Sequence, residues 1–480
     1  MTAERTAQDE HPAQDGHDVS LGQEALWFLQ KLAPASPAYN VAMAVRIRQR
    51  LDDAALRRAA ASVAARHELL RSGFTERDGR PRRIVADALP HLLEVRELPD
   101  ATDEQLDAAA REAVARPFDL AEPGPVRLLL LRRSAEDAVL LLAAHHTVTD
   151  GASQVLVLED LLATYRAELD GAGQDGSGAA RPYREYVAAE RELLDSPRRA
   201  VLADHWRAVC DGVPSALELP TDRPRPARKR FTGASWDFRL PEELAGSLRP
   251  AAAAAGVTPF VLLFGTFQAL LHRWTAQPEF LVGYAVSTRP ERTMRNTVGY
   301  FVNTLPCRAA FTDGDLTFRR LLERTADQLR QGLAHRDLPL PLLPAELGLP
   351  HDPSRTPVFQ SMFSLITATR FQPLLELLAP EDGAKPELVH HGVRLTGFDL
   401  PQQEGQFDLS AEVLQSGGAV KVAFKYDTDL FDAATVGRMA NHYRLLLAAA
   451  VADPDLSVRR VPLVDAAERA TLLSFATAAW

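Results

Sequence analysis

The sequence predicts a mixed α/β protein built from two lobes. At 480 residues, the chain exceeds the usual size of a domain with a single hydrophobic core. Strand-like and helix-like patterns alternate along its first third, stop at a glycine-rich stretch at 170–180, and resume beyond a proline-rich connector at 220–230. This resumption indicates two lobes of similar plan.

The first lobe is expected at 19–180, after a polar, mobile tail at 1–18 that lacks periodicity. Apolar spacing predicts helices at 21–32, 52–67 and 152–169 and a strand at 39–47. A continuous apolar run at 138–144 is typical of a strand that is buried on both faces.

The second lobe is expected at 181–462. Its apolar pattern predicts a helix at 261–274 and strands at 280–286 and 300–308. The same alternation of helices and strands as in the first lobe supports a second core of its own.

Composition excludes several classes of protein. With 46% hydrophobic and 25% charged residues the chain is a folded globular protein, and its net charge of -10 would repel a nucleic acid. Only Cys210 and Cys307 are present, which indicates a reducing compartment. Polar residues interrupt the early apolar stretch, so neither a signal peptide nor a membrane span is expected. We therefore expect a cytoplasmic protein without nucleic-acid or membrane partners.

A histidine pair follows the predicted buried strand directly. The run at 145–151 reads His-His-Thr-Val-Thr-Asp-Gly, and helical spacing begins immediately after it. The pair therefore lies on a strand-to-helix turn, and a neutral imidazole there can take a proton from an attacking amine or hydroxyl. We expect the active site of an acyltransferase, with one histidine facing the substrate, because consecutive residues at a strand end point to opposite faces.

The neighbours of the pair have expected roles of their own. Asp150 could orient an imidazole, but we favour a scaffold carboxylate that pairs with a buried arginine. Gly151 suits a backbone position of special conformation or of close approach to substrate. Ser153 could hydrogen-bond the nucleophile or cap the first helical turn.

The residues that a metal-dependent or a covalent mechanism would need are not found near the histidine pair. No metal is expected, because no HExxH motif or cysteine cluster supplies further ligands. No covalent intermediate is expected, because there is no GxSxG elbow and no thiol nearby. Direct transfer through a ternary complex remains.

The run at 145–151 resembles the HHxxxDG signature of the condensation domains of nonribosomal peptide synthetases. Six further stretches are similar to the other motifs of this family, in the family's order and over nearly the whole chain. They lie at 21–29, 66–71, 183–186 together with Trp206, 298–305, 335–339 and 352–360.

The resemblance implies a V-shaped pseudodimer of two chloramphenicol-acetyltransferase-like lobes with a central tunnel. Two carrier proteins would insert phosphopantetheine arms, one bearing a donor acyl thioester and the other an acceptor aminoacyl thioester, and the domain itself would bind no cofactor. His146 would be the catalytic residue, as a general base or as the group that positions the amine. His145 would turn into the fold, and Asp150 would pair with Arg66 or Arg289.

The resemblance also implies neighbouring domains. Residues 463–480 are similar to the linker into an adenylation domain, so a downstream adenylation domain and an acceptor carrier protein are expected partners. If Met1 is the natural start, the donor carrier protein would act from another polypeptide. The product would be an amide in nonribosomal peptide or hybrid polyketide-peptide biosynthesis.

Departures and alternatives qualify this picture. Ala152 stands where many relatives carry Trp and Leu340 where Phe is common, which indicates a different pocket on the acceptor side. An ester product and a non-catalytic recruitment domain of the same fold stay open as alternatives, whereas the matches at 302–305 and 357–360 disfavour an epimerization domain. Most other motif residues are expected to pack or to hold loops: His67, Tyr183, Trp206, Asn303, Asp337, Arg355 and Phe407.

Overall fold

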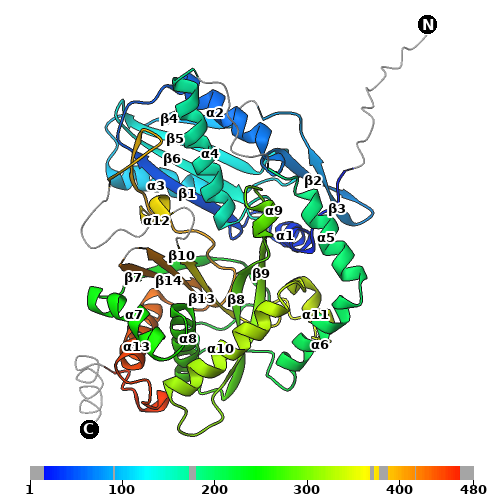
Figure 1. The fold of residues 1–480 in the computed structure, drawn as a ribbon, viewed down its shortest axis with the longest axis vertical. Helices are drawn as coiled ribbons and strands as arrows, with labels where there is room; N and C mark the ends of the chain where they lie inside the picture. The colour runs from blue at the N-terminus through cyan, green and yellow to red at the C-terminus, as the bar shows by residue number, and fades with distance from the viewer. Residues whose placement is uncertain are drawn as a thin grey trace.

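The computed structural model describes residues 16–89, 92–171, 180–367, 372–377, 387–416 and 418–464. Two lobes lie one above the other in Figure 1, each with a six-stranded sheet and helices packed against it. Two separate clusters of buried hydrophobic side chains form their cores. The expected mixed α/β fold with two lobes is confirmed.

The N-terminal lobe is built on a sheet with the strand order β11-β12-β1-β6-β5-β4. These strands are β1 (Asn40–Ile47), β4 (Leu93–Glu97), β5 (Val126–Ser134), β6 (Asp137–His145), β11 (Glu387–His390) and β12 (Val393–Gly397). β1 and β5 flank β6 as antiparallel neighbours, and every residue of β6 is buried, as its apolar sequence predicts. The other elements are α1 (Leu21–Leu32), α2 (Asp53–Arg66), β2 (Ser72–Arg77), β3 (Arg80–Val85), α3 (Asp103–Ala115) and α4 (Gly151–Leu169).

The C-terminal lobe has the strand order β7-β14-β13-β10-β8-β9. These strands are β7 (Gly233–Arg239), β8 (Glu279–Ser287), β9 (Val302–Ala310), β10 (Ser361–Thr367), β13 (Leu409–Ser416) and β14 (Ala419–Asp427). α8, α10 and α13 lie on the side of this sheet that faces away from the other lobe (Figure 1). The helices in the second half of the chain are α5 (Arg184–Asp195), α6 (Arg198–Cys210), α7 (Glu242–Ala254), α8 (Pro259–Thr275), α9 (Glu291–Met294), α10 (Phe318–Ala334), α11 (Leu343–Glu346), α12 (Gln372–Glu376) and α13 (Ala433–Ala452). Of these, α5, α9 and α12 place buried side chains (Val187, Met294 and Leu374) in the N-terminal core.

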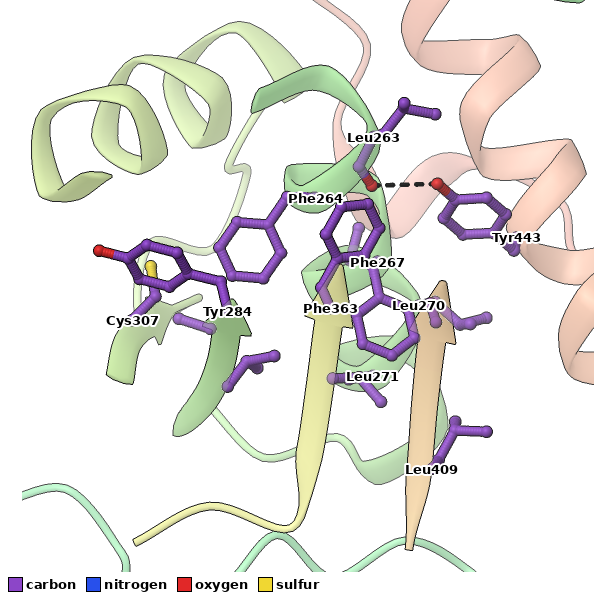
Figure 2. Packing of buried hydrophobic residues seen from close by; sticks show 14 of the residues in the cluster. Leu263, Phe264, Phe267, Leu270, Leu271, Tyr284, Cys307, Phe363, Leu409 and Tyr443 are labelled. Carbon is purple, nitrogen blue, oxygen red and sulfur yellow. Dashed lines mark hydrogen bonds between the residues drawn. The ribbon is translucent and has the colours of Figure 1, made fainter. Parts of the chain in front are cut away.

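Aromatic side chains fill the core between this sheet and its helices. Figure 2 shows Phe264 and Phe267 of α8 against Phe363 of β10, with ring centroids 5.3 and 5.8 Å apart. Tyr443 of α13 also reaches α8, because its buried hydroxyl donates a 3.1 Å hydrogen bond to the carbonyl of Leu263. This core fixes the sheet that faces the other lobe.

The hairpin β11–β12 crosses from one lobe to the other. Its residues fall in the range 181–462, which the sequence assigns to the C-terminal lobe, but β12 pairs antiparallel with β1, with Ile47 opposite Leu395. Leu395 and Val393 are buried in the N-terminal core, and the gold hairpin lies among blue and cyan strands in Figure 1. The division at 180/181 therefore needs this correction, because short strands do not reveal a distant partner.

The N-terminal end of the chain differs in part from the expected mobile tail. Within the expected mobile tail 1–18, residues 1–15 lie outside the described residues, but His17 forms an isolated β-bridge with Arg83. Residues 465–480 of the expected linker lie outside the described residues as well. In the described part of the chain no single helix is long and apolar enough to cross a membrane; α7 and α8 pass that test only as a pair, bent by 102°.

Candidate active site

The histidine motif lies on a tight turn between β6 and α4. His145 is the last residue of β6, and Asp150 is the N-cap of α4. The His146 backbone N–H donates to the carbonyl of Tyr39 (2.8 Å), and the Gln23 side chain donates to the carbonyl of Thr147 (2.7 Å). α1 and the residue that precedes β1 therefore fix the backbone of the turn.

The side chain of His146 is held in one tautomer. Its Nδ1 lies 2.7 Å from the carbonyl oxygen of Thr149. Because a carbonyl only accepts hydrogen bonds, Nδ1 carries the proton and the lone pair is on Nε2. The ring packs edge-on against Tyr300 with centroids 5.0 Å apart, and Nε2 has no hydrogen-bond partner among the described residues. This is the tautomer that can accept a proton from a substrate.

The surroundings keep His146 uncharged. Burial lowers the pKa of His146, against the opposing effects of the Thr149 carbonyl and the Asp150 carboxylate. The positive charge of Lys425 lowers this pKa further. Lys425 is a buried residue of β14, on the other lobe, and pairs with Glu412 of β13 at 3.0 Å. The imidazole is therefore neutral near pH 7.

His145 is fully buried, on the opposite side of the turn. Its Nδ1 accepts the backbone N–H of Thr147 (3.2 Å) and lies 3.0 Å from the hydroxyl of the same residue. Burial lowers the pKa of His145 to about 3, with a smaller contribution from His146. The two histidines thus do not converge on a common ligand, and His145 is part of the fold.

Asp150 is the centre of a buried network that joins the two halves of the chain. Its carboxylate accepts the backbone N–H groups of Ser153 (2.7 Å) and Phe301 (3.1 Å). Arg289 donates to both carboxylate oxygens at 3.0 and 3.1 Å, and its guanidinium lies 4.1 Å from the ring centroid of Phe301. The geometry makes Asp150 a helix cap and an ion-pair partner, with no contact to either imidazole in the described hydrogen bonds.

Arg66 does not pair with Asp150. It lies 3.2 Å from Asp160, whose carboxylate also binds His67 at 2.7 Å. Of the two arginines that the resemblance implies, the partner is therefore Arg289. Arg66 ends α2, and its side chain reaches the middle of α4, because α2 packs along that helix.

Ser153 holds the neighbouring segment at Gly299 and does not cap α4. Its side chain is fully buried and donates to the carbonyl of Gly299 (2.9 Å), while it accepts from the N–H of Gly299 (3.0 Å) and from Arg289 (2.7 Å). The cap is Asp150. A side chain at position 299 would collide with Tyr183, whose ring carbon lies 2.4 Å from the place of a Cβ atom.

Gly151 does not adopt a special backbone conformation. Its φ is outside the left-handed region, and a Cβ atom at this exposed position would meet nothing within 4 Å. Of the two roles expected for Gly151, the special conformation is not seen, and the open space beside the turn leaves room for a close approach of substrate.

A cavity of about 570 Å³ lies between the lobes. Tyr39, whose carbonyl holds the backbone of His146, is the residue next to its wall, and its ring lies 6.4 Å from that of Phe231, which lines the cavity. The N-terminal lobe contributes 33–38, Arg111, Val114 and Ala115, and the second half of the chain contributes 230–233, 401–404 and Thr428.

The sequence did not single out Tyr300, which packs on His146, Lys425, which lowers its pKa, or Glu412, which pairs with Lys425. Tyr300 lies in one of the matched motifs, but only the fold shows that its ring packs on His146. Its backbone carbonyl accepts the hydroxyl of Tyr183 at 2.6 Å. Lys425 and Glu412 lie on neighbouring strands of the other lobe. The only local sign of these two residues in the sequence is the alternation of polar residues in those strands.

Most of the remaining motif residues hold loops or pack. Asn303 donates to the carbonyls of Arg336 (2.8 Å) and Leu338 (2.7 Å), which fixes the segment at 335–339. Arg355 pairs with Glu218 at 2.9 Å. Trp206 donates to the carbonyl of His335, Phe407 stacks on Phe359, and Asp337 is exposed.

The fold and the turn define a two-lobed α/β protein with an HHxxxDG histidine motif between its lobes. The model of the Condensation domain family matches residues 13–473. The chain therefore belongs to the condensation-domain family of nonribosomal peptide synthetases.

Relatives in sequence are much longer proteins. Phosphinothricin tripeptide synthetase PhsC of Streptomyces viridochromogenes is 34% identical over 465 residues, which are 94% of this chain and 41% of that protein. Isonitrile lipopeptide synthase of Mycobacterium tuberculosis is 32% identical over 464 residues, 95% of this chain and 18% of that protein. The chain thus spans less than half the length of either relative.

Solved structures share the fold. Holo-AB3403, a four-domain nonribosomal peptide synthetase bound to AMP and glycine, superposes with a TM-score of 0.87 at 24% identity, over 97% of this chain and 35% of that one. The X-domain from teicoplanin biosynthesis, solved in complex with OxyB, gives a TM-score of 0.80 at 25% identity, over 97% of this chain and 100% of that one.

Proposed function

We propose that this domain joins a donor acyl thioester to an acceptor aminoacyl thioester through an amide bond, in nonribosomal peptide or hybrid polyketide-peptide biosynthesis. One observation carries the proposal: Nδ1 of His146 is committed to the Thr149 carbonyl, so the lone pair of Nε2 is available to a substrate. Membership of the condensation-domain family supports acyl transfer. His146 is the proposed catalytic residue, and His145, Asp150 and Gly151 support it.

The reaction needs one proton to move. The acceptor amine attacks the thioester carbonyl carbon, the C–N bond forms, and the C–S bond breaks. One amine proton passes to Nε2 of His146 and then to the thiolate that leaves. A lowered pKa keeps His146 neutral but makes it a weak base. Alignment of two tethered substrates can contribute about 7 to 11 kcal/mol, in addition to the part that His146 plays as a base or as the group that positions the amine.

The substrates are proposed to arrive on phosphopantetheine arms of two carrier proteins. The cavity between the lobes supports one such approach, because residues of both lobes line it and Tyr39 lies between its wall and the backbone of His146. Its volume of about 570 Å³ is within the usual range for small-molecule sites.

Neighbouring domains complete the proposal. A donor carrier protein, in the same or another polypeptide, would precede the reaction, and a downstream adenylation domain would load the acceptor carrier protein. The relatives support this arrangement, because the chain corresponds to only part of each of them.

A second candidate function is non-catalytic recruitment of another protein. The X-domain complexed with OxyB has the same fold, which favours this possibility. Against it, His146 is present in the base tautomer and the Asp150 network is complete. Ester formation by the same chemistry differs only in the acceptor nucleophile.

One experiment separates these functions. The domain is mixed with an acyl-loaded donor carrier protein and with an acceptor carrier protein that bears either an aminoacyl or a hydroxyacyl thioester, and intact mass is read over time. We expect the acyl mass to move to the aminoacyl acceptor in a product that resists hydroxylamine at the new bond. Transfer only to the hydroxyacyl acceptor, or no transfer to either by a protein that binds both carriers, would overturn amide formation.

A further inference from the structure

A second histidine pair lies at the turn of the crossing hairpin β11–β12. His390 ends β11 opposite Val393, and the turn residues His391 and Gly392 have φ angles of 48° and 74°. Positive φ at both central residues is typical of a type I′ hairpin turn. This turn brings both imidazoles to Glu159 of α4, with Nε2 atoms 2.5 and 2.7 Å from the two carboxylate oxygens.

We propose that Glu159, His390 and His391 bind a divalent transition-metal ion of the zinc class. Their three ligand atoms lie within 4.8 Å of one another. Two imidazole nitrogens and one carboxylate oxygen suit zinc, whereas magnesium and calcium take oxygen ligands. Water would supply the fourth position of a tetrahedron.

The present geometry needs only a small adjustment to hold an ion. Metal–ligand distances of about 2.0 to 2.1 Å place tetrahedral donors about 3.3 Å apart, so each nitrogen–oxygen contact must lengthen by less than about 1 Å. The side chains of Glu159, His390 and His391 are 27%, 20% and 33% exposed, which allows this movement and gives an ion access from solvent.

The same three residues can also join without an ion. Two neutral imidazoles that carry their protons on Nε2 would both donate to the Glu159 carboxylate. A metal ion needs the Nε2 lone pairs and therefore displaces these protons, so protons compete with the ion. Arg166 lies beside Gly392 of this turn and is a positive charge close to the proposed ion. Its guanidinium pairs with Asp170 at 2.8 Å.

An ion bound here would fix the hairpin β11–β12, which crosses from one lobe to the other, to the N-terminal lobe. β12 already pairs with β1, and the ion would tie the same hairpin to α4, whose first residue follows Asp150. The sequence analysis predicts no metal site, because it looks for metal ligands that lie close together in the sequence. Here Glu159 and His390 are separated by 231 positions in the chain.

Zinc titration of the whole chain tests the site. Tag-free protein is stripped with a chelator, and Zn²⁺ alone is titrated by calorimetry. We expect one ion per chain and at least about 10-fold weaker binding by His390→Gln and His391→Gln, with unchanged binding by His351→Gln, which alters an exposed histidine elsewhere. Absence of stoichiometric binding, or equal affinity of all four folded proteins, would overturn the proposal.

Coordination is tested independently with Cu²⁺ by electron paramagnetic resonance. The wild-type protein is expected to show coupling to two imidazole nitrogens, and His391→Gln to only one. A spectrum without imidazole coupling, or one unchanged in His391→Gln, would also contradict the site. Circular dichroism shows whether each variant is folded, so a loss of binding is read only from folded protein.

Discussion

Arg289 binds Asp150 with one guanidinium nitrogen that lies 3.0 Å from Oδ1 and 3.1 Å from Oδ2. Both side chains are 5% exposed. The pair connects the turn that carries His146 with the segment between β8 and β9, which belongs to the second half of the chain. The position of the turn that carries His146 thus depends on a contact between residues 139 positions apart.

Arg289→Met should strongly destabilise the protein. It leaves the Asp150 carboxylate buried without its cation, a change that typically costs about 3 to 5 kcal/mol. Urea unfolding measures the free energy, with Arg319→Met as the matched control, because Arg319 forms an exposed pair with Asp455. The control should lose far less stability, because exposed ion pairs contribute little. Equal losses in both variants would show that the buried pair has no special role.

Ser153→Ala should change stability and leave substrate binding unaltered. The variant removes the acceptor of Arg289 and of the Gly299 N–H, so we expect a loss of about 1 to 3 kcal/mol. Ser247→Ala, in which only a bond to the Glu243 carbonyl is lost, should stay within about 0.5 kcal/mol. An increased acceptor KM with unchanged stability would instead make Ser153 a substrate contact.

His145 should make stability depend on pH. Its pKa is about 3 in the folded protein and about 6.5 when unfolded. Because the unfolded chain takes up the proton first as the pH falls, this stability is present above pH 6.5 and is lost between pH 6.5 and pH 3. At about pH 5 the loss reaches about 2 kcal/mol.

His145→Asn is the test of that dependence. The asparagine oxygen can accept the Thr147 N–H in place of Nδ1 but does not titrate. Between about pH 7.5 and about pH 5, the variant should lose about 2 kcal/mol less than the wild type in urea unfolding. The same acid sensitivity in both proteins would refute a buried neutral His145.

Lys425→Met should move the pH dependence of the condensation rate. The Lys425 charge lowers the pKa of His146, so its removal raises that pKa, and the acidic fall in rate should begin at a higher pH. Single-turnover rates are measured with one substrate pair, so titration of the amine is common to all proteins. Lys421→Met, whose ammonium binds Asp399 and Asp237 instead, should show no shift. A shift to lower pH, or an equal shift in both variants, contradicts this.

Local patterns were sufficient to predict the elements that carry the histidines. The helix expected at 21–32 is α1, and its start is fixed by a capping box between Ser20 and Gln23. The apolar run at 138–144 lies within β6, because a strand buried on both faces needs no polar positions. A turn must connect such a strand to α4, so the strand and the helix together locate the histidine motif on that turn.

Long-range pairings could not be predicted in the same way. Arg66 and Arg289 were equal candidates for Asp150, and only the packing of α2 against α4 takes Arg66 to Asp160. Lys425 approaches His146 because two sheets face each other, which no window of sequence contains. The crossing of β11–β12 depends on an open edge at β1, and a single strand carries no record of its partner.

The most direct test of the proposed function is the single-turnover rate of His146→Ala with loaded donor and acceptor carrier proteins. We predict a fall of about 10² to 10⁴-fold, with an unchanged circular dichroism spectrum and unchanged binding of both carriers. His145→Asn serves as the matched control and should keep most of the rate, because the asparagine oxygen can accept the Thr147 N–H in place of Nδ1 and so preserve the turn. A His146→Ala rate within a few-fold of the wild type would contradict the catalytic role of His146.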